Sequence, residues 1–363
     1  MLMKLHILST ASIFIAFGVP HAFATDFYWD GGTANWSTAS AWSTVAGATT
    51  PNPGSFPSSS TTSDLIFNIT TASTSANTVS LAGASRLARS MTFHTSGTSG
   101  FRAGGSSSVS VNLTIGAGGI TLNSGAGSVI ISQNPSTSGV ITTVLGSSQT
   151  WSNNGAGVLS VLGNVNNGAN LLTVDGTGNT SISGVIGGGA GGLTKNGSGK
   201  LTLSAANTYT GATSVSAGTL FVTGSLTSDV TLTGTGTIGG GGTVGALSLG
   251  GTSFFDIADV LASNNPLDAT AISFAASGFG IDNLKASGAA VDWTAVATGT
   301  YTLINGTLNS TNLENLGLEN AYALGGGKSA YFQSGSLQLV VIPETSSLIL
   351  GGLGLFSMLR RRR

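Results

Sequence analysis

The chain has no cysteine and few charged residues. Its 363 residues include only 12 Lys or Arg and 13 Asp or Glu. Without cysteine there are no disulfide bridges, so stability must come from backbone pairing and packing. Between Ala103 and Thr194 the only charged residue is Asp175, and residues 25–342 hold seven basic against twelve acidic side chains. No basic stripe is present to follow phosphates, which argues against a nucleic-acid partner.

Residues suited to catalysis or cofactor binding are equally scarce. His94 is the only histidine after residue 24, so no histidine cluster can form, and we interpret it as a strand or surface residue. Gly234 to Gly239 fits G-x-G-x-x-G, but a strand-like segment follows instead of a helix, and 56 glycines make chance matches common. Asp175 alone offers too few carboxylates for calcium. We therefore expect no catalytic residue, no cofactor and no metal.

Short clusters of Val, Ile, Leu and Thr are abundant, and Gly, Asn and Ser separate them. Examples are Val109–Ile115, Leu201–Leu203 and Leu220–Val222. Period-2 alternation bounded by turn residues predicts β-strands, and helical periodicity is almost missing before residue 310. The recurring β-branched residues also argue against a disordered glycine-rich linker.

The clusters repeat along the chain at a nearly constant interval. Five segments share a glycine followed by a strand-like run, and these glycines recur at almost even steps: Gly139, Gly157, Gly178, Gly199 and Gly218. Such an interval is typical of one coil of a β-solenoid, whose coils bury an apolar face only when stacked. Stacking would also set equal charges directly opposite one another, which is unfavourable and explains the few charged residues.

One stretch carries a family resemblance. Residues 191–204 read Gly-Gly-Leu-Thr-Lys-Asn-Gly-Ser-Gly-Lys-Leu-Thr-Leu-Ser, and Asn207-Thr-Tyr-Thr-Gly211 and Gly218-Thr-Leu220 follow. This stretch, taken as residues 191–222, closely resembles the autotransporter-associated β-strand repeat. The resemblance implies a right-handed parallel β-helix of the kind displayed on bacterial surfaces, and it carries no activity with it.

The N-terminal segment 1–24 is predicted to be a signal peptide. Lys4 precedes an apolar stretch from Ile7 to Val19, and Ala22-Phe23-Ala24 fits the small-x-small cleavage pattern. The apolar stretch is short for a bilayer-spanning helix. We expect the exported chain to begin at Thr25.

The C-terminal residues predict a short membrane anchor. Residues 345–359 are uncharged and Arg360, Arg361, Arg362 and Arg363 follow, which places the arginines on the cytoplasmic side. This arrangement, with Pro343 and Glu344 before it, resembles a PEP-CTERM sorting signal, although Thr345 replaces the second proline. The resemblance implies an exosortase-type processing enzyme, transient anchoring in the inner membrane of a Gram-negative-type bacterium, and release to the cell surface or extracellular matrix.

Aromatic residues gather near the start of the predicted exported chain. Trp29, Trp36 and Trp42 are interpreted as a cap on the open solenoid end, with carbohydrate stacking as the alternative. A closing cap with a short helix around residues 312–320 is expected at the other end. The predicted division is 1–24 signal peptide, 25–63 N-terminal cap, 64–275 β-solenoid, 276–341 C-terminal cap and 342–363 sorting signal.

Two hypotheses for function follow. The first is an exported, non-enzymatic β-solenoid that adheres to exopolysaccharide or cells through an uncharged Ser, Thr and Asn face. The alternative is a β-helical polysaccharide lyase or hydrolase, which needs clustered carboxylates or a base with a cation. Its candidate residues are the most closely spaced acidic residues and a nearby lysine: Asp256, Asp259, Asp268, Asp282 and Lys285.

Overall fold

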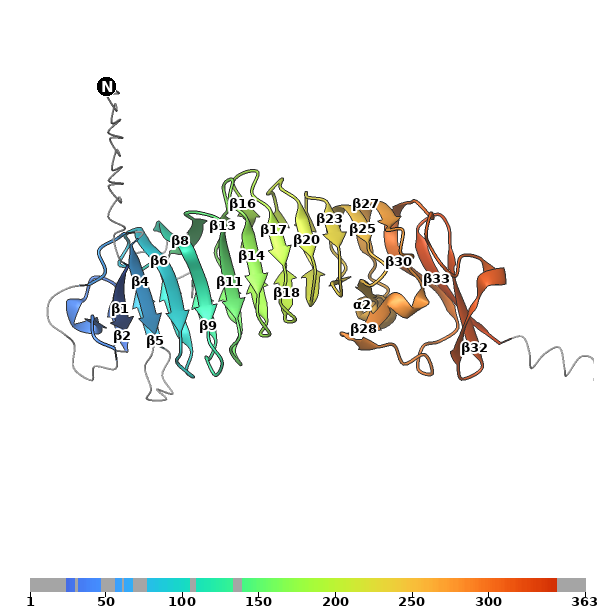
Figure 1. Cartoon of the computed structure of the whole chain (residues 1–363), viewed down its shortest axis with the longest axis horizontal. Helices are drawn as coiled ribbons and strands as arrows, with labels where there is room; N and C mark the ends of the chain where they lie inside the picture. Colours follow the sequence, from blue (N-terminus) through green and yellow to red (C-terminus); the bar gives the residue numbers. More distant parts are fainter. Residues whose placement is uncertain are drawn as a thin grey trace, which may run out of the picture.

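The protein is an elongated stack of short strands in sequence order (Figure 1). A computed structural model describes residues 24–29, 32–46, 56–60, 62–67, 77–104, 109–132 and 139–344. Strands of successive coils pair in parallel, as the glycine-spaced repeat predicts, and form two long sheets. The chain is therefore mostly β, with the architecture of a β-solenoid.

One strand of each coil belongs to a 12-stranded sheet, which we call sheet B. All of its strands pair in parallel except the last, which turns back on its neighbour. In order they are β2 (Thr33–Asn35), β5 (Asn77–Ser80), β7 (Ser99–Arg102), β9 (Val129–Ile131), β12 (Leu159–Val161), β15 (Thr180–Ile182), β18 (Lys200–Leu203), β21 (Thr219–Val222), β24 (Thr237–Gly239), β26 (Phe254–Asp256), β28 (Leu284–Ala286) and β29 (Ala289–Ala290).

The other strands form the 21-stranded sheet A, whose rungs divide into two columns in the middle of the molecule. Long strands precede the division: β1 (Thr25–Trp29), β4 (Ser63–Phe67), β6 (Arg86–Phe93) and β8 (Ser110–Leu122). One column holds β10 (Val140–Leu145), β13 (Val165–Asn166), β16 (Ile186–Gly187), β19 (Ala206–Asn207) and β22 (Ser225–Leu226). The other holds β11 (Gln149–Asn153), β14 (Leu172–Asp175), β17 (Leu193–Lys195), β20 (Thr213–Val215) and β23 (Val230–Leu232). Both rejoin in β25 (Thr243–Leu249) and β27 (Leu267–Phe274).

The core is built from ladders of equivalent side chains. On sheet B one inward ladder is entirely apolar and fully buried: Phe101, Ile131, Val161, Ile182, Leu203 and Val222. Alternate residues point outward, because successive side chains of a strand face opposite sides. Turns between strands pack closely, and a Cβ on Gly197 would lie 2.1 Å from the carbonyl oxygen of Gly176, one coil away. Glycine is required there for backbone approach.

Antiparallel strands lie at both ends of the parallel stack. At the N-terminal end β3 (Trp42–Ser43) pairs antiparallel with β1, while β1 itself pairs in parallel with β4. At the C-terminal end β30 (Gly299–Leu308) is parallel to β27 and antiparallel to β33 (Leu337–Pro343). β32 (Lys328–Gln333) lies next to β33, and β31 (Tyr322–Gly325) pairs with β32 on the far side from β33. Parallel pairing thus runs from Thr25 in β1 to Leu308 in β30.

Helical segments are short. The helix α2 (Ala258–Ser263) follows β26, and single 3-10 turns occupy Ala39–Ala41, Ile281–Asn283 and Leu318–Asn320. The prediction of a helix around residues 312–320 was wrong, because only the 3-10 turn at Leu318–Asn320 forms there. Asn312 and Asn315 have φ of 63° and 52°, which interrupt a right-handed helix.

No helix of the described residues is long and apolar enough to cross a membrane. Residues 1–23 of the predicted signal peptide lie outside the described residues, and Ala24 is the first described residue. The predicted anchor with Thr345 and the arginine cluster also lies outside them.

Candidate functional site

A row of hydroxyl side chains runs along the outer face of sheet A. We call these seven residues the hydroxyl ladder: Thr150, Thr173, Thr194, Ser214, Thr231, Ser248 and Ser273. Each is the register partner of the next, so neighbours are about 4.8 Å apart along the stack. The row exists because each short strand of this column has one outward residue between two inward ones. Seven coils in succession place Thr or Ser there.

The ladder hydroxyls are available to a ligand. All seven side chains are half-buried or exposed. Only Ser273 uses its hydroxyl within the described part of the chain, donating to the carbonyl oxygen of Leu247 at 3.5 Å. The other six have no intramolecular hydrogen-bond partner among the described residues. Because each hydroxyl can both donate and accept, the ladder is a regular row of free hydrogen-bonding groups without net charge.

An apolar side chain lies beside the N-terminal end of the ladder. Leu171 is 40% exposed and, with Thr150, Thr173 and Gly118, lines a shallow groove of about 280 Å³. Thr150 and Thr173 are register partners in that groove. A ligand lying there would meet hydroxyls and an apolar surface together, which is the mixture that a polyol with C–H faces requires.

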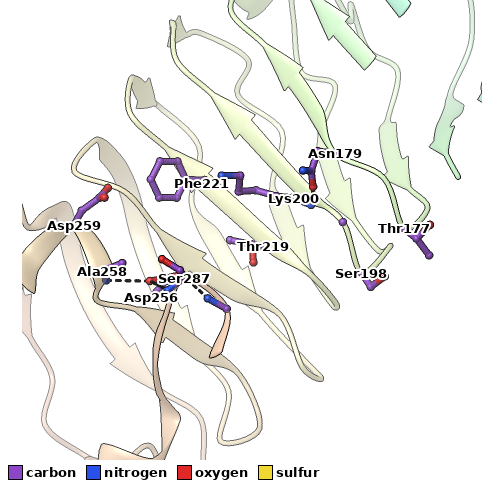
Figure 2. Close-up of a pocket in the computed structure, with 12 residues that line it drawn as sticks. Thr177, Asn179, Ser198, Lys200, Thr219, Phe221, Asp256, Ala258, Asp259 and Ser287 are labelled. Carbon is purple, nitrogen blue, oxygen red and sulfur yellow. Dashed lines mark hydrogen bonds between the residues drawn. The ribbon is translucent and has the colours of Figure 1, made fainter. Parts of the chain in front are cut away.

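A second groove lies on sheet B, next to α2 (Figure 2). Its volume is about 470 Å³, and Lys200 and Phe221 line it from β18 and β21. The Lys200 ammonium lies 5.0 Å from the centroid of the Phe221 ring, a cation–π arrangement. Asp256, Asp259 and the turn residues Ser287 and Gly288 line it from the C-terminal side.

Asp256 has a structural role in this groove. It is 6% exposed, and one carboxylate oxygen accepts hydrogen bonds from the backbone N–H groups of Ala258 and Ser287, each at 3.0 Å. The other oxygen accepts from the N–H of Gly288 at 3.1 Å. Its carboxylate therefore joins α2 to the turn between β28 and β29.

Asp259 is half-buried and its carboxylate has no partner among the described residues. It is the groove's free carboxylate, whereas hydrolysis of a glycosidic bond generally uses two.

The remaining charged candidates do not join Asp256 and Asp259 in the groove. Asp268 accepts a hydrogen bond from Asn305 Nδ2 at 2.8 Å, and Lys285 Nζ lies 3.5 Å from the Phe254 ring centroid. Asp282 interacts with Tyr322 and raises the pKa of its phenol. No group of three potential metal ligands from His, Cys, Asp and Glu exists among the described residues.

The three N-terminal tryptophans are completely buried. Trp29 and Trp42 meet edge to face with ring centroids 4.8 Å apart, and Trp36 lies 5.7 Å from Trp42. Trp42 Nε1 donates to the carbonyl oxygen of Trp36 at 2.9 Å. Stacking on a sugar needs an exposed ring face, so this arrangement corresponds to the core of the first coil and not to the carbohydrate-stacking alternative.

His94 and Asp175, which the sequence offered as candidate polar residues, lie apart from these surfaces. His94 is exposed and its ring nitrogens lie 3.1 and 3.2 Å from Asn123 Nδ2. Asp175 accepts a hydrogen bond from the N–H of the next residue, Gly176, at 2.7 Å.

The two described residues of the predicted sorting motif lie at the edge of the folded stack. Pro343 is exposed, ends β33 and pairs with Lys328. The N–H of Glu344 donates to the carbonyl oxygen of Gly327 at 2.8 Å. A processing enzyme acting here would have to draw the end of β33 away from β32.

Sequence reasoning missed a buried lysine in the core. Lys195 is 2% exposed and occupies an inward ladder between Val174 and Val215. Its ammonium donates to the carbonyl oxygens of Gly197 and Ala217, which belong to turns of successive coils. Burial lowers the pKa of Lys195 from 10.5 to about 8, and nearby Asp175 opposes this shift. The position of Lys195 two residues after Leu193 was its only sequence signal, because period-2 alternation turns both inward.

Comparison with known proteins gives one family match. The model named Passenger-associated-transport-repeat matches residues 193–222, which run from the first residue of β17 to the last residue of β21. No curated protein and no solved structure is significantly similar to the chain. The matched segment contains Thr194 and Ser214 of the hydroxyl ladder and Lys200 and Phe221 of the groove, so it includes part of both surfaces described above. The chain thus carries a passenger-associated transport repeat, which suggests a secreted or surface β-rich protein similar to autotransporter passengers.

Proposed function

We propose that the protein is an exported, non-enzymatic β-solenoid that adheres to neutral polysaccharide at the cell surface or in the extracellular matrix. The observation that carries this proposal is the hydroxyl ladder, with six hydroxyls free of intramolecular partners among the described residues. A polysaccharide also presents hydroxyl groups at regular intervals, so ladder and polymer can exchange hydrogen bonds along their length. The transport repeat at 193–222 supports export to the surface.

Affinity in this proposal comes from repetition. One solvent-exposed hydroxyl contributes little, because a protein–ligand hydrogen bond replaces bonds to water. The seven hydroxyls are fixed on one rigid stack. Once one of them has bound the polymer, the others bind the same polymer chain in effectively intramolecular steps, which raises avidity. The absence of charge from the ladder predicts that binding will depend little on salt concentration.

The test is retention of the full exported chain on polysaccharide from the producer's own matrix. A triple variant, T173V/T194V/T231V, removes three hydroxyls while keeping β-branched side chains, and we expect at least tenfold weaker retention. The control S160A/S181A/T202V removes three outward hydroxyls from neighbouring rungs of sheet B and should bind normally. Absence of retention of the native chain at every salt concentration would overturn the proposal, as would equal loss in both variants.

We further propose that the coil is right-handed, and that an exosortase-type enzyme processes the chain near Pro343 and Glu344 after transient anchoring in the inner membrane. Pro343 ends the last strand, so cleavage after it would leave the stack complete. Mass spectrometry of the C-terminus in envelope and culture fractions tests the processing step. An intact Arg363 in the secreted pool would contradict cleavage.

A further inference from the structure

The groove on sheet B is a discrete feature on an otherwise repetitive stack. It lies where α2 and the β28–β29 turn stand beside the strands of sheet B (Figures 1 and 2). Its volume of about 470 Å³ is within the range of small-molecule sites. This is room for a short chain of sugar rings.

The floor of the groove contains an aromatic ring beside a gap in the side-chain ladder. Phe221 is half-buried and follows Ser160, Ser181 and Thr202 along one outward ladder. Its partner on the next rung is Gly239, which has no side chain. A Cβ there would lie 2.8 Å from Asp256 Cβ, so this glycine allows Asp256 to pack close to the strand. The groove therefore contains an apolar aromatic ring next to polar lining residues.

Two opposite charges line the groove without pairing. The Lys200 ammonium rests near the Phe221 ring, and Asp259 lies on α2; neither forms a salt bridge among the described residues. Asn179, Ser198 and Thr219 add hydrogen-bonding groups to the lining. A ligand hydroxyl can accept from an ammonium and donate to a carboxylate, so a polyol can satisfy both walls.

We propose that this groove binds a short segment of a neutral oligosaccharide, with a sugar ring against Phe221 and hydroxyls shared between Lys200 and Asp259. The charged groups of the lining are Lys200, Asp256 and Asp259, so acidic side chains outnumber basic ones and an anionic sugar is disfavoured. The groove is separate from the hydroxyl ladder, and either surface can function without the other.

Isothermal titration calorimetry of the full chain with cellotetraose, maltotetraose and mannotetraose tests the proposal. We expect saturable binding of at least one of them, little changed by salt. Phe221→Ala should weaken that binding about tenfold and Asp259→Asn several-fold. Ser181→Ala, two rungs from Phe221 and outside the groove lining, is the matched control. Thermal unfolding of each variant verifies folding.

The outcomes separate this proposal from adhesion through the ladder. The T173V/T194V/T231V variant should bind the tetrasaccharide normally, and Phe221→Ala should still be retained on polysaccharide. Failure of all three neutral tetrasaccharides to bind would overturn the groove proposal. It is also overturned if Phe221→Ala binds as well as the native chain, or if tetragalacturonate binds more tightly than the neutral sugars and is released by salt.

Discussion

The two outward surfaces of the stack use the same coils in different ways. The hydroxyl ladder on sheet A repeats one chemical group over seven rungs, from Thr150 to Ser273. The outward ladder of sheet B carries similar residues over three rungs only, at Ser160, Ser181 and Thr202. Ile130 precedes them, and Phe221 and Gly239 follow. A repetitive surface can bind a repetitive polymer in several equivalent positions. A break in the repeat instead creates a single site, which can bind one ligand in one orientation.

The groove also depends on an insertion between two strands of the stack. Helix α2 lies between β26 and β27 in the chain, and Asp256 joins it to the β28–β29 turn through three backbone hydrogen bonds. No other α-helix occurs among the described residues, and α2 lines the groove on sheet B. The shared core supports both surfaces, so substitutions can be chosen that affect both surfaces or only one.

The largest effect is expected from the shared core. Leu201 is fully buried in β18, and Leu201→Ala should lower the free energy of unfolding by about 3 kcal/mol, because it removes buried methyl groups and leaves a cavity. The neighbouring outward substitution Thr202→Ala should change it by less than about 0.5 kcal/mol. Chemical denaturation measures both. Equal destabilisation by the two variants would contradict the assignment of inward and outward positions.

The buried lysine gives a pH-dependent effect of similar size. With the pKa of Lys195 near 8 in the folded chain and 10.5 when unfolded, the unfolded chain binds more protons above pH 8. The free energy of unfolding should therefore rise as pH increases from 8 toward 10.5, by at most about 3 kcal/mol over the whole interval.

Denaturation at pH 7.5, 8.5 and 9.5 measures this rise before most tyrosines ionise. Lys195→Met should remove it, while Lys200→Met, at an exposed position in the next strand, should keep it. A native chain whose stability does not change over this range would show that the buried amine is not desolvated as the structure indicates.

The repeat architecture was largely predictable from sequence. Evenly spaced glycines and alternating apolar residues indicate stacked coils, and register partners such as Leu201 and Leu220 lie one such interval apart in the chain. The same alternation fixes which side faces out, so the Ser and Thr content of an outer face was also foreseeable. The residues that make up the hydroxyl ladder depend on turn lengths, which vary from coil to coil and set the register.

The groove could not be predicted in the same way. Asp256 and Asp259 were noted because acidic residues are rare, but sequence does not show that backbone N–H groups of Ser287 and Gly288 surround Asp256. The contact depends on the β28–β29 turn, where Ser287 has φ of 52°. Nor does sequence show that Lys200, from a coil much earlier in the chain, lines the same groove.

A smaller, local effect is expected at Asp256. Asp256→Ala leaves three backbone N–H groups without their acceptor and should lower the free energy of unfolding by about 2 kcal/mol. It should weaken tetrasaccharide binding in the groove and leave retention on polysaccharide unchanged. Asp259→Asn, whose side chain has no partner among the described residues, should leave stability unchanged within about 0.5 kcal/mol. If Asp256→Ala weakened both kinds of binding equally, the surfaces would not be independent.

The smallest effects are expected one rung at a time on the ladder. Thr194→Val should reduce the free energy of binding to polysaccharide by about 0.5 kcal/mol, with Thr173 and Thr231 adding similar steps, because each hydroxyl contributes one exchangeable hydrogen bond. Retention curves of single, double and triple variants measure the series. Graded loss is what a repetitive surface requires. Complete loss on a single substitution would instead show that the ladder contains a discrete site, and the distinction between the two surfaces would then be wrong.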